Sequence, residues 1–127
     1  MIRLAIVIVS FNAREDLART LASLRDAPPA TPHQIVVVDN GSTDGAPVMV
    51  RERFPAVRVL DAGGNLGFAR ANNLGIRASS GELVLLLNPD TAGALEDVDR
   101  ASFQIVEVGA DHGIVAADVY VETELVR

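Results

Sequence analysis

Short, largely aliphatic runs recur along the first 90 residues, and each of them ends abruptly in small polar residues. The runs lie at residues 4–9, 35–38, 57–60 and 83–87. An apolar run without polar alternation is typical of a strand that is covered on both faces, as in a parallel sheet. The run at 83–87 contains only Leu and Val, so we expect it to occupy a central position in that sheet.

The segment after the first run has the spacing of an amphipathic helix. Leu17, Leu21 and Leu24 follow one another at i, i+4 and i+7, which places them on one helical face. Asn12 is predicted to cap this helix, and Glu15, three residues later, is predicted to return the bond. This segment is therefore the first predicted helix.

Further helices are predicted between and after the other runs. A proline in the first turn suits a helix that opens near residues 46–47 and ends before Phe54. Another helix is expected over residues 67–78. Towards the carboxyl end, the pattern indicates a helix from about Ala94 and a strand at 113–117.

This alternation indicates an α/β protein with three layers, in which helices cover both faces of a mostly parallel sheet. The chain has 127 residues, which is enough for one core and too short for two ordinary domains. We therefore expect a single domain over residues 1–127. No apolar run approaches the roughly 18 residues of a membrane span, and no signal-like segment opens the chain. The expected location is cytoplasmic.

Composition excludes several classes of function. The formal net charge is −6, from 17 acidic residues against 11 basic ones, and this argues against a nucleic-acid partner. The chain has no Cys, so disulfides and thiolate metal sites are excluded. All the basic residues are Arg. The absence of Lys excludes a P-loop lysine and Schiff-base chemistry.

The polar residues that end the runs are the candidate site. Singly, an Asn or Asp there is typical of a turn or a helix cap. In a parallel sheet, however, the carboxyl ends of the strands share one edge, where ligands bind. Asp90 follows the most apolar run and offers the hard oxygen ligands that suit Mg or Mn. Asn88, Pro89 and Asp90 are therefore the first site candidate.

Two nucleotide-binding folds with the same alternation do not match. A dinucleotide-binding unit needs a glycine-rich turn after the first strand, but residues 10–14 contain no glycine. A phosphoacceptor receiver domain needs an acidic pair after the first strand and a late lysine, and both are missing. The remaining interpretation is a sheet that holds a nucleotide through side chains at its strand ends, with a metal at Asp90.

Four segments in this order resemble the amino-terminal half of the family 2 glycosyltransferases with the GT-A fold, particularly rhamnosyltransferase-like members. The resemblance is strong over roughly residues 1–92, and the segments are residues 7–12, 36–45, 65–75 and 85–91. It implies an inverting transfer of a sugar, rhamnose being one candidate, from a nucleotide diphosphate donor to an acceptor hydroxyl. Mg or Mn would bind the diphosphate. The acceptor would be a glycan or a lipid-linked glycan, which suits a peripheral position at the inner membrane face.

The resemblance also implies roles for residues of the first, second and fourth segments. Asp39 matches the acid that binds the nucleotide base. The strand exit at residues 9–11, with Ser10 and Phe11, matches the wall of the base pocket, and Asn12 completes this donor-binding segment. Asp90 matches the metal ligand.

Further roles concern the diphosphate and the ribose. Asn65 and Gly67 match the loop near the donor phosphates, where a helix amino terminus favours an anion. The family arginine falls at Asn72, and Arg70 lies two positions earlier as its candidate substitute. Asn88 replaces the first acid of the metal motif, and it is expected to contact the ribose and to leave metal binding weaker.

No general base is assigned, because none of the acids after Asp90 lies in a recognisable motif. The acids after Asp90 include Asp111, Asp118, Glu122 and Glu124. The acceptor half is thus short or missing, and an unfinished sheet favours association into a homo-oligomer. A noncatalytic nucleotide-sugar-binding module, or an inactive fragment of such an enzyme, stays open as the alternative.

Three more polar residues are interpreted as structural. Asp44 is predicted to form a turn or cap a helix rather than bind a ligand. His33 and His112 are isolated in the sequence, and both are expected to be ordinary surface residues.

Overall fold

A computed structural model describes residues 4–80, 83–90, 103–108 and 114–118 of the chain. The elements are β1 (Leu4–Ser10), α1 (Arg14–Asp26), β2 (His33–Asp39), α2 (Ala46–Arg53), β3 (Arg58–Asp61), α3 (Phe68–Ala78), β4 (Leu83–Leu87), β5 (Phe103–Val108) and β6 (Ile114–Asp118). Within these ranges, no helix is both long and apolar enough to cross a membrane.

The sheet has six strands in the order β3-β2-β1-β4-β5-β6. The first four strands of the sequence pair in parallel, whereas β5 and β6 are antiparallel additions beside β4. The mostly parallel sheet is confirmed, and β4 lies between β1 and β5, in the central position expected of it. The strand predicted at 113–117 is β6, whereas β5 was not predicted. The helix predicted from about Ala94 begins outside the described residues.

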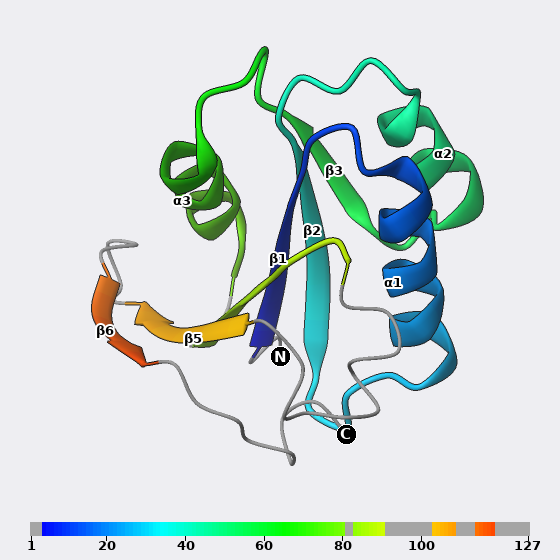
Figure 1. Cartoon of the computed structure of the whole chain (residues 1–127). Coiled ribbons are helices and arrows are strands. Elements are labelled where there is room, and N and C mark those ends of the chain that lie inside the picture. The colour runs from blue at the N-terminus through cyan, green and yellow to red at the C-terminus, as the bar shows by residue number, and fades with distance from the viewer. Residues whose placement is uncertain (1–3, 81–82, 91–102, 109–113, 119–127) are drawn as a thin grey trace.

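Helices cover both faces of this sheet, as Figure 1 shows. Ile6 and Ile8 of β1 belong to the core beneath α1 and α2, whereas Ala5 and Val7 belong to the core beneath α3. Successive side chains of a strand point to opposite faces, so a strand buried on both faces must be apolar at every position. The three-layer arrangement predicted from the unbroken apolar runs is confirmed.

Helix α3 lies unusually close to the sheet at Gly75. A Cβ atom at this position would come within 2.4 Å of Val7 Cγ1 and 3.1 Å of Val38 Cγ2. Such distances are shorter than van der Waals contact, so only glycine allows the helix to pack this closely. This contact fixes the height of α3 above β1 and β2.

The capping box predicted for α1 is wrong. The N-cap residue is Ala13, and no side chain caps the helix from that position. Asn12 has a positive φ of 48°, and its Oδ1 accepts a hydrogen bond from Thr43 N at 2.8 Å. The first helical N–H, that of Arg14, donates instead to Asp44 Oδ2 at 3.0 Å. A residue 30 positions away provides the cap, which local spacing does not reveal.

Candidate functional site

The carboxyl ends of the parallel strands meet at one edge of the sheet, as predicted. Ser10 pairs with Asp39, and Asp39 pairs with Asp61, at the last positions of β1, β2 and β3. Leu87, the last residue of β4, pairs with Ile8. Residues 88–90 therefore leave the sheet at this same edge, which we call the rim. The crevice beyond such an edge is where open α/β sheets bind ligands.

Two buried polar atoms at the rim have no hydrogen-bond partner in the part of the chain that the structure describes. Ser10 is fully buried, and Asp39 is 4% exposed. Asp39 Oδ2 accepts a bond from Ser42 N at 3.0 Å. Asp39 Oδ1 and Ser10 Oγ, by contrast, are buried and accept or donate no hydrogen bond among the described residues. In the described ranges, no other buried side-chain nitrogen or oxygen atom lacks a partner. Leaving such groups unpaired costs about 1–3 kcal/mol each, so these two atoms are candidates to bind a ligand.

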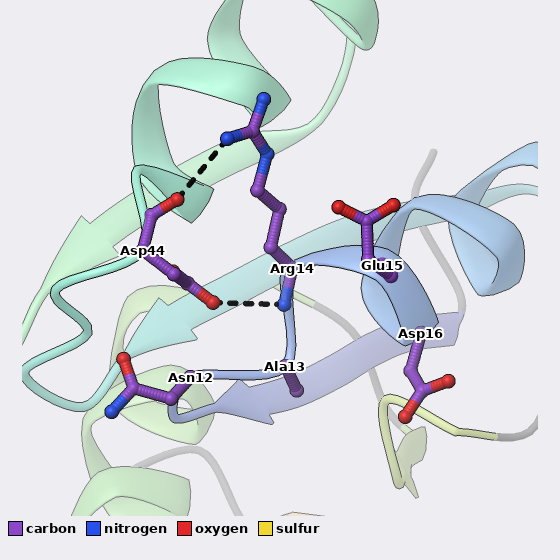
Figure 2. Close-up of a pocket in the computed structure, with 6 residues that line it drawn as sticks. All are labelled: Asn12, Ala13, Arg14, Glu15, Asp16 and Asp44. Atoms are coloured by element: carbon purple, nitrogen blue, oxygen red, sulfur yellow. Dashed lines mark hydrogen bonds between the residues drawn. The ribbon is translucent and has the colours of Figure 1, made fainter.

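The loops that follow β1 and β2 are joined to each other beside these atoms. Asn12 N donates to Ser42 Oγ at 2.9 Å, and Thr43 N donates to Asn12 Oδ1. Arg14 donates twice to Asp44, from its backbone N to Oδ2 and from Nη1 to the backbone oxygen at 3.2 Å. Figure 2 shows both of these last bonds. These hydrogen bonds thus hold the two loops against each other.

Asp44 caps two helices with one carboxylate. Its Oδ2 accepts from the first N–H of α1, and its Oδ1 accepts from Ala46 N, the first residue of α2, at 3.1 Å. A negative charge at two helix amino termini is also favoured by the helix dipoles. The prediction that Asp44 has a structural role is confirmed.

A cavity of about 380 Å³ opens beside this carboxylate, at the amino-terminal end of α1 (Figure 2). It is lined by Asn12, Ala13, Arg14, Glu15, Asp16 and Asp44. Three carboxylates against one guanidinium make it unfavourable for a diphosphate. Of the ten predicted donor-binding residues, Asn12 alone lines this cavity, so we do not assign the donor to it.

The loop between β3 and α3 is tied to the end of β2 by two amide side chains. Asn40 is 4% exposed; its Nδ2 donates to Asn65 Oδ1 at 3.1 Å, and its Oδ1 accepts from Leu66 N at 2.9 Å. Asn65 Oδ1 also accepts from Gly67 N at 2.9 Å. The sequence did not single out Asn40 as a site residue, because an Asn-Gly pair after a strand is an ordinary turn signal.

The predicted site residues of α3 have different environments. Gly67 is the N-cap residue, with a φ of +83° and no side-chain cap. Asn72 is buried at 6% exposure and packs towards the sheet. Arg70 is exposed and forms no ion pair within the described residues. The structure therefore leaves Arg70 available to an anion, whereas Asn72 belongs to the underside of the helix.

The exit of β4 is anchored to α1. The fully buried Thr20 donates from Oγ1 to the Pro89 carbonyl oxygen at 2.5 Å. Asn88 is half-buried, and Asp90 is exposed. No cluster of three or more His, Cys, Asp or Glu side chains suited to a metal occurs among the described residues. Asp90 therefore lies exposed on an anchored turn, and it belongs to no such cluster within the described residues.

His33, the histidine within the described residues, makes no contact with the rim. His33 is half-buried at the start of β2, and its Nδ1 lies 3.0 Å from the Thr31 carbonyl oxygen. This contact ties His33 to its own turn, at the opposite edge of the sheet from the rim. His112 lies outside the described residues.

The amino-acid sequence of this chain matches a known protein family. The profile of "Glycosyl transferase family 2" matches residues 5–101. The chain is 36% identical over 108 residues to the N-acetylglucosaminyl-diphospho-decaprenol L-rhamnosyltransferase of Mycobacterium tuberculosis, a match that covers 76% of this chain and 34% of that protein. It is 30% identical over 129 residues to an N-acetylglucosaminyltransferase of Bradyrhizobium elkanii, covering 96% of this chain and 71% of that protein.

A solved structure confirms the fold. The mannosyltransferase PcManGT from Pyrobaculum calidifontis, in complex with GDP-Man and Mn²⁺, superposes with a TM-score of 0.63 at 28% sequence identity, over 69% of this chain and 27% of that one. The arrangement is thus that of a partial GT-A domain. The chain spans about a third of the length of the mycobacterial relative. From its sequence and its fold alike, the chain belongs to glycosyl transferase family 2.

Proposed function

We propose that this chain is the donor-binding part of a glycosyltransferase, which moves a sugar from a nucleotide diphosphate donor to an acceptor hydroxyl. The observation that carries the proposal is the pair of unpartnered buried atoms at the rim, Asp39 Oδ1 and Ser10 Oγ. The family membership supports it, and so does the complex of PcManGT with GDP-Man and Mn²⁺.

The unpartnered atoms suit a nucleotide base with a ring N–H beside a carbonyl. Asp39 Oδ1 accepts the N–H, and the Ser10 hydroxyl donates to the carbonyl oxygen. Both residues end paired strands in register, and partners in register point to the same face of a sheet. Uracil, thymine and guanine offer this pattern on one edge. Phe11, 48% exposed at the next position, is placed to contact the base.

The diphosphate would bind between the β4 exit and the β3–α3 loop. Asp90 would supply an oxygen ligand to the metal and Asn88 would contact the ribose. Magnesium sites of this kind need only one or two protein carboxylates because substrate phosphates complete the shell, so the exposed carboxylate of Asp90 fits a metal that arrives with the donor. When bound, the metal would neutralise the leaving diphosphate. Arg70 and the uncapped amino terminus of α3 after Gly67 add positive potential on the other side.

The finer parts of the proposal follow from the relatives. We infer an inverting displacement at the anomeric carbon, and rhamnose as a candidate sugar because the mycobacterial relative is an L-rhamnosyltransferase. That relative is named for a diphospho-decaprenol substrate, so a lipid-linked glycan at the cytoplasmic face of the membrane is the corresponding acceptor.

Calorimetric titration tests the donor site. The chain is titrated with UDP, dTDP and GDP, each with Mn²⁺, with Mg²⁺ and with excess chelator. We expect one of the three to bind in a metal-dependent way. If none binds under any of these conditions, the proposed donor site is wrong.

A noncatalytic nucleotide-sugar-binding module is the second candidate, because Asp39 Oδ1 and Ser10 Oγ, which have no partner among the described residues, would bind a donor whether or not its sugar is transferred. The two are separated by incubating the chain with the matching nucleotide sugar and an extract that contains acceptors. A transferase releases nucleoside diphosphate in proportion to labelled product, whereas a binding module retains the nucleotide sugar intact.

A further inference from the structure

The end of β2 supports the β3–α3 loop at three consecutive residues. The Asp39 carbonyl oxygen accepts from Ala62 N at 2.9 Å, and Asn40 makes the two side-chain bonds to residues 65 and 66. Gly41, with a φ of +92°, lies so close that a Cβ atom there would come within 2.9 Å of Asn65 N. The loop at residues 62–67 is therefore built against Asp39 and its neighbours.

Backbone donors determine the orientation of both amide side chains. Asn40 must present its oxygen to Leu66 N, because a backbone N–H can only donate. Its Nδ2 consequently faces Asn65. Asn65 must in turn present its oxygen, because that atom also accepts from Gly67 N. Neither amide can be flipped without losing a backbone bond, so the donor and acceptor roles are unambiguous.

We propose that Asn40 is a positioning residue of the donor site, which acts through Asn65 to hold residues 62–67 and the amino terminus of α3 in place beside Asp39. This inference rests on the proposed function. Asp39 would hold the base and the loop would face the diphosphate, so Asn40 sets the spacing between the two halves of the donor. Holding both in advance lowers the ordering cost of binding.

The roles of the two amides make isosteric substitutions unequal. Asn40→Asp replaces the Nδ2 donor with an oxygen that faces Asn65 Oδ1, and Asn65 cannot turn away without releasing Gly67 N. Asn65→Asp, by contrast, keeps an oxygen that accepts from both Asn40 Nδ2 and Gly67 N. The first change should open the loop, whereas the second should leave it closed.

Two measurements on the 127-residue chain test this. Hydrogen exchange by NMR reports the protection of the Leu66 and Gly67 amides. Calorimetry reports the affinity for whichever of UDP, dTDP or GDP binds the unmodified chain most tightly with Mn²⁺. Asn73→Asp, on an exposed position of α3, is the charge-matched control. Asn65→Ala removes the exposed partner of the pair without a charge change, and it serves as a second variant if Asn40→Asp does not fold.

We expect Asn40→Asp and Asn65→Ala to lose protection at Gly67 and to bind roughly tenfold more weakly. Asn65→Asp should keep the protection, and Asn73→Asp should change neither protection nor affinity beyond its added charge. Retained protection in Asn40→Asp, or lost protection with the affinity of the Asn73→Asp control, overturns the positioning role alone. If no nucleoside diphosphate binds the unmodified chain, the proposed function fails first and the positioning role fails with it.

Discussion

Two groups of polar residues stand side by side at the rim, and they differ in how completely their hydrogen bonds are satisfied. In the loops after β1 and β2, Asn12 and Asp44 use their side-chain oxygens on backbone N–H groups. At the ends of the same two strands, Asp39 Oδ1 and Ser10 Oγ are buried without a partner among the described residues. The first group connects the two loops, whereas we propose that the second binds the donor.

Under the proposed function, this difference separates structural from donor-binding residues of the same chemical type. Asp39 and Asp44 are both carboxylates five positions apart in one segment. Asp44 gains its stabilising bonds within the chain, so its removal should cost stability. Asp39 Oδ1 has no partner within the described ranges, and such a buried group lowers the stability of the free protein. Under the proposed function, this cost is recovered when the oxygen accepts a hydrogen bond from the base.

The largest expected effect concerns the metal. Asp90→Ala should abolish the dependence of nucleoside diphosphate binding on Mg²⁺ or Mn²⁺, with a loss on the order of several kcal/mol, because the bound ion neutralises the diphosphate charge. Calorimetry with metal and with excess chelator measures it. Equal affinity of the unmodified chain under both conditions would remove Asp90 from the site. Asp61→Ala, at the end of β3, is the control for loss of a rim carboxylate.

Asp39→Ala should weaken nucleotide binding by roughly 1–3 kcal/mol, because the base loses a buried acceptor. The affinity for the preferred nucleoside diphosphate is compared with that of the unmodified chain, and circular dichroism confirms the fold. An unchanged affinity in a folded variant would assign Asp39 to its turn, through the bond to Ser42 N, and would break the distinction between the two groups.

Asp44→Ala should do the reverse. It removes the caps of α1 and α2, so we expect the free energy of unfolding to fall by roughly 1–2 kcal/mol, while nucleotide affinity stays within error. Urea unfolding measures the loss. Asp44→Asn keeps one of the two acceptor oxygens and should fall between. A loss of affinity as large as that of Asp39→Ala would show that Asp44 belongs to the donor site.

The smallest effect is expected at Ser10. Ser10→Ala deletes a buried hydroxyl that has no partner, so stability should stay unchanged or rise by up to about 1 kcal/mol, while nucleotide affinity falls by about 1 kcal/mol. Ser79→Ala is the matched control, because that buried hydroxyl donates to the Ile76 carbonyl oxygen at 2.8 Å and should lose stability. A loss of stability in Ser10→Ala would indicate that its hydroxyl is paired after all.

The amino-acid sequence by itself determined the architecture and the rim. Unbroken apolar runs predicted parallel strands buried on both faces, and the leucines of α1 lie in the core as their spacing predicted. The abrupt polar ends of these runs predicted where the candidate site lies. These features follow from local periodicity and from the need to keep water out of both faces, so they can be seen without knowledge of distant contacts.

Only the tertiary structure decided which polar side chains form hydrogen bonds within the chain. Asp44 caps α1 across 30 positions, and Asn40 orients Asn65 across 25. The placement of β5 beside β4 likewise depends on an antiparallel pairing between distant residues. Hydrogen bonds between loops depend on where the folded sheet brings strand ends together. The local pattern of a strand or helix does not reveal which distant residues it will contact. The sequence therefore locates the polar residues at the rim. The fold decides which of them form hydrogen bonds within the described chain and which have a buried atom without a partner there.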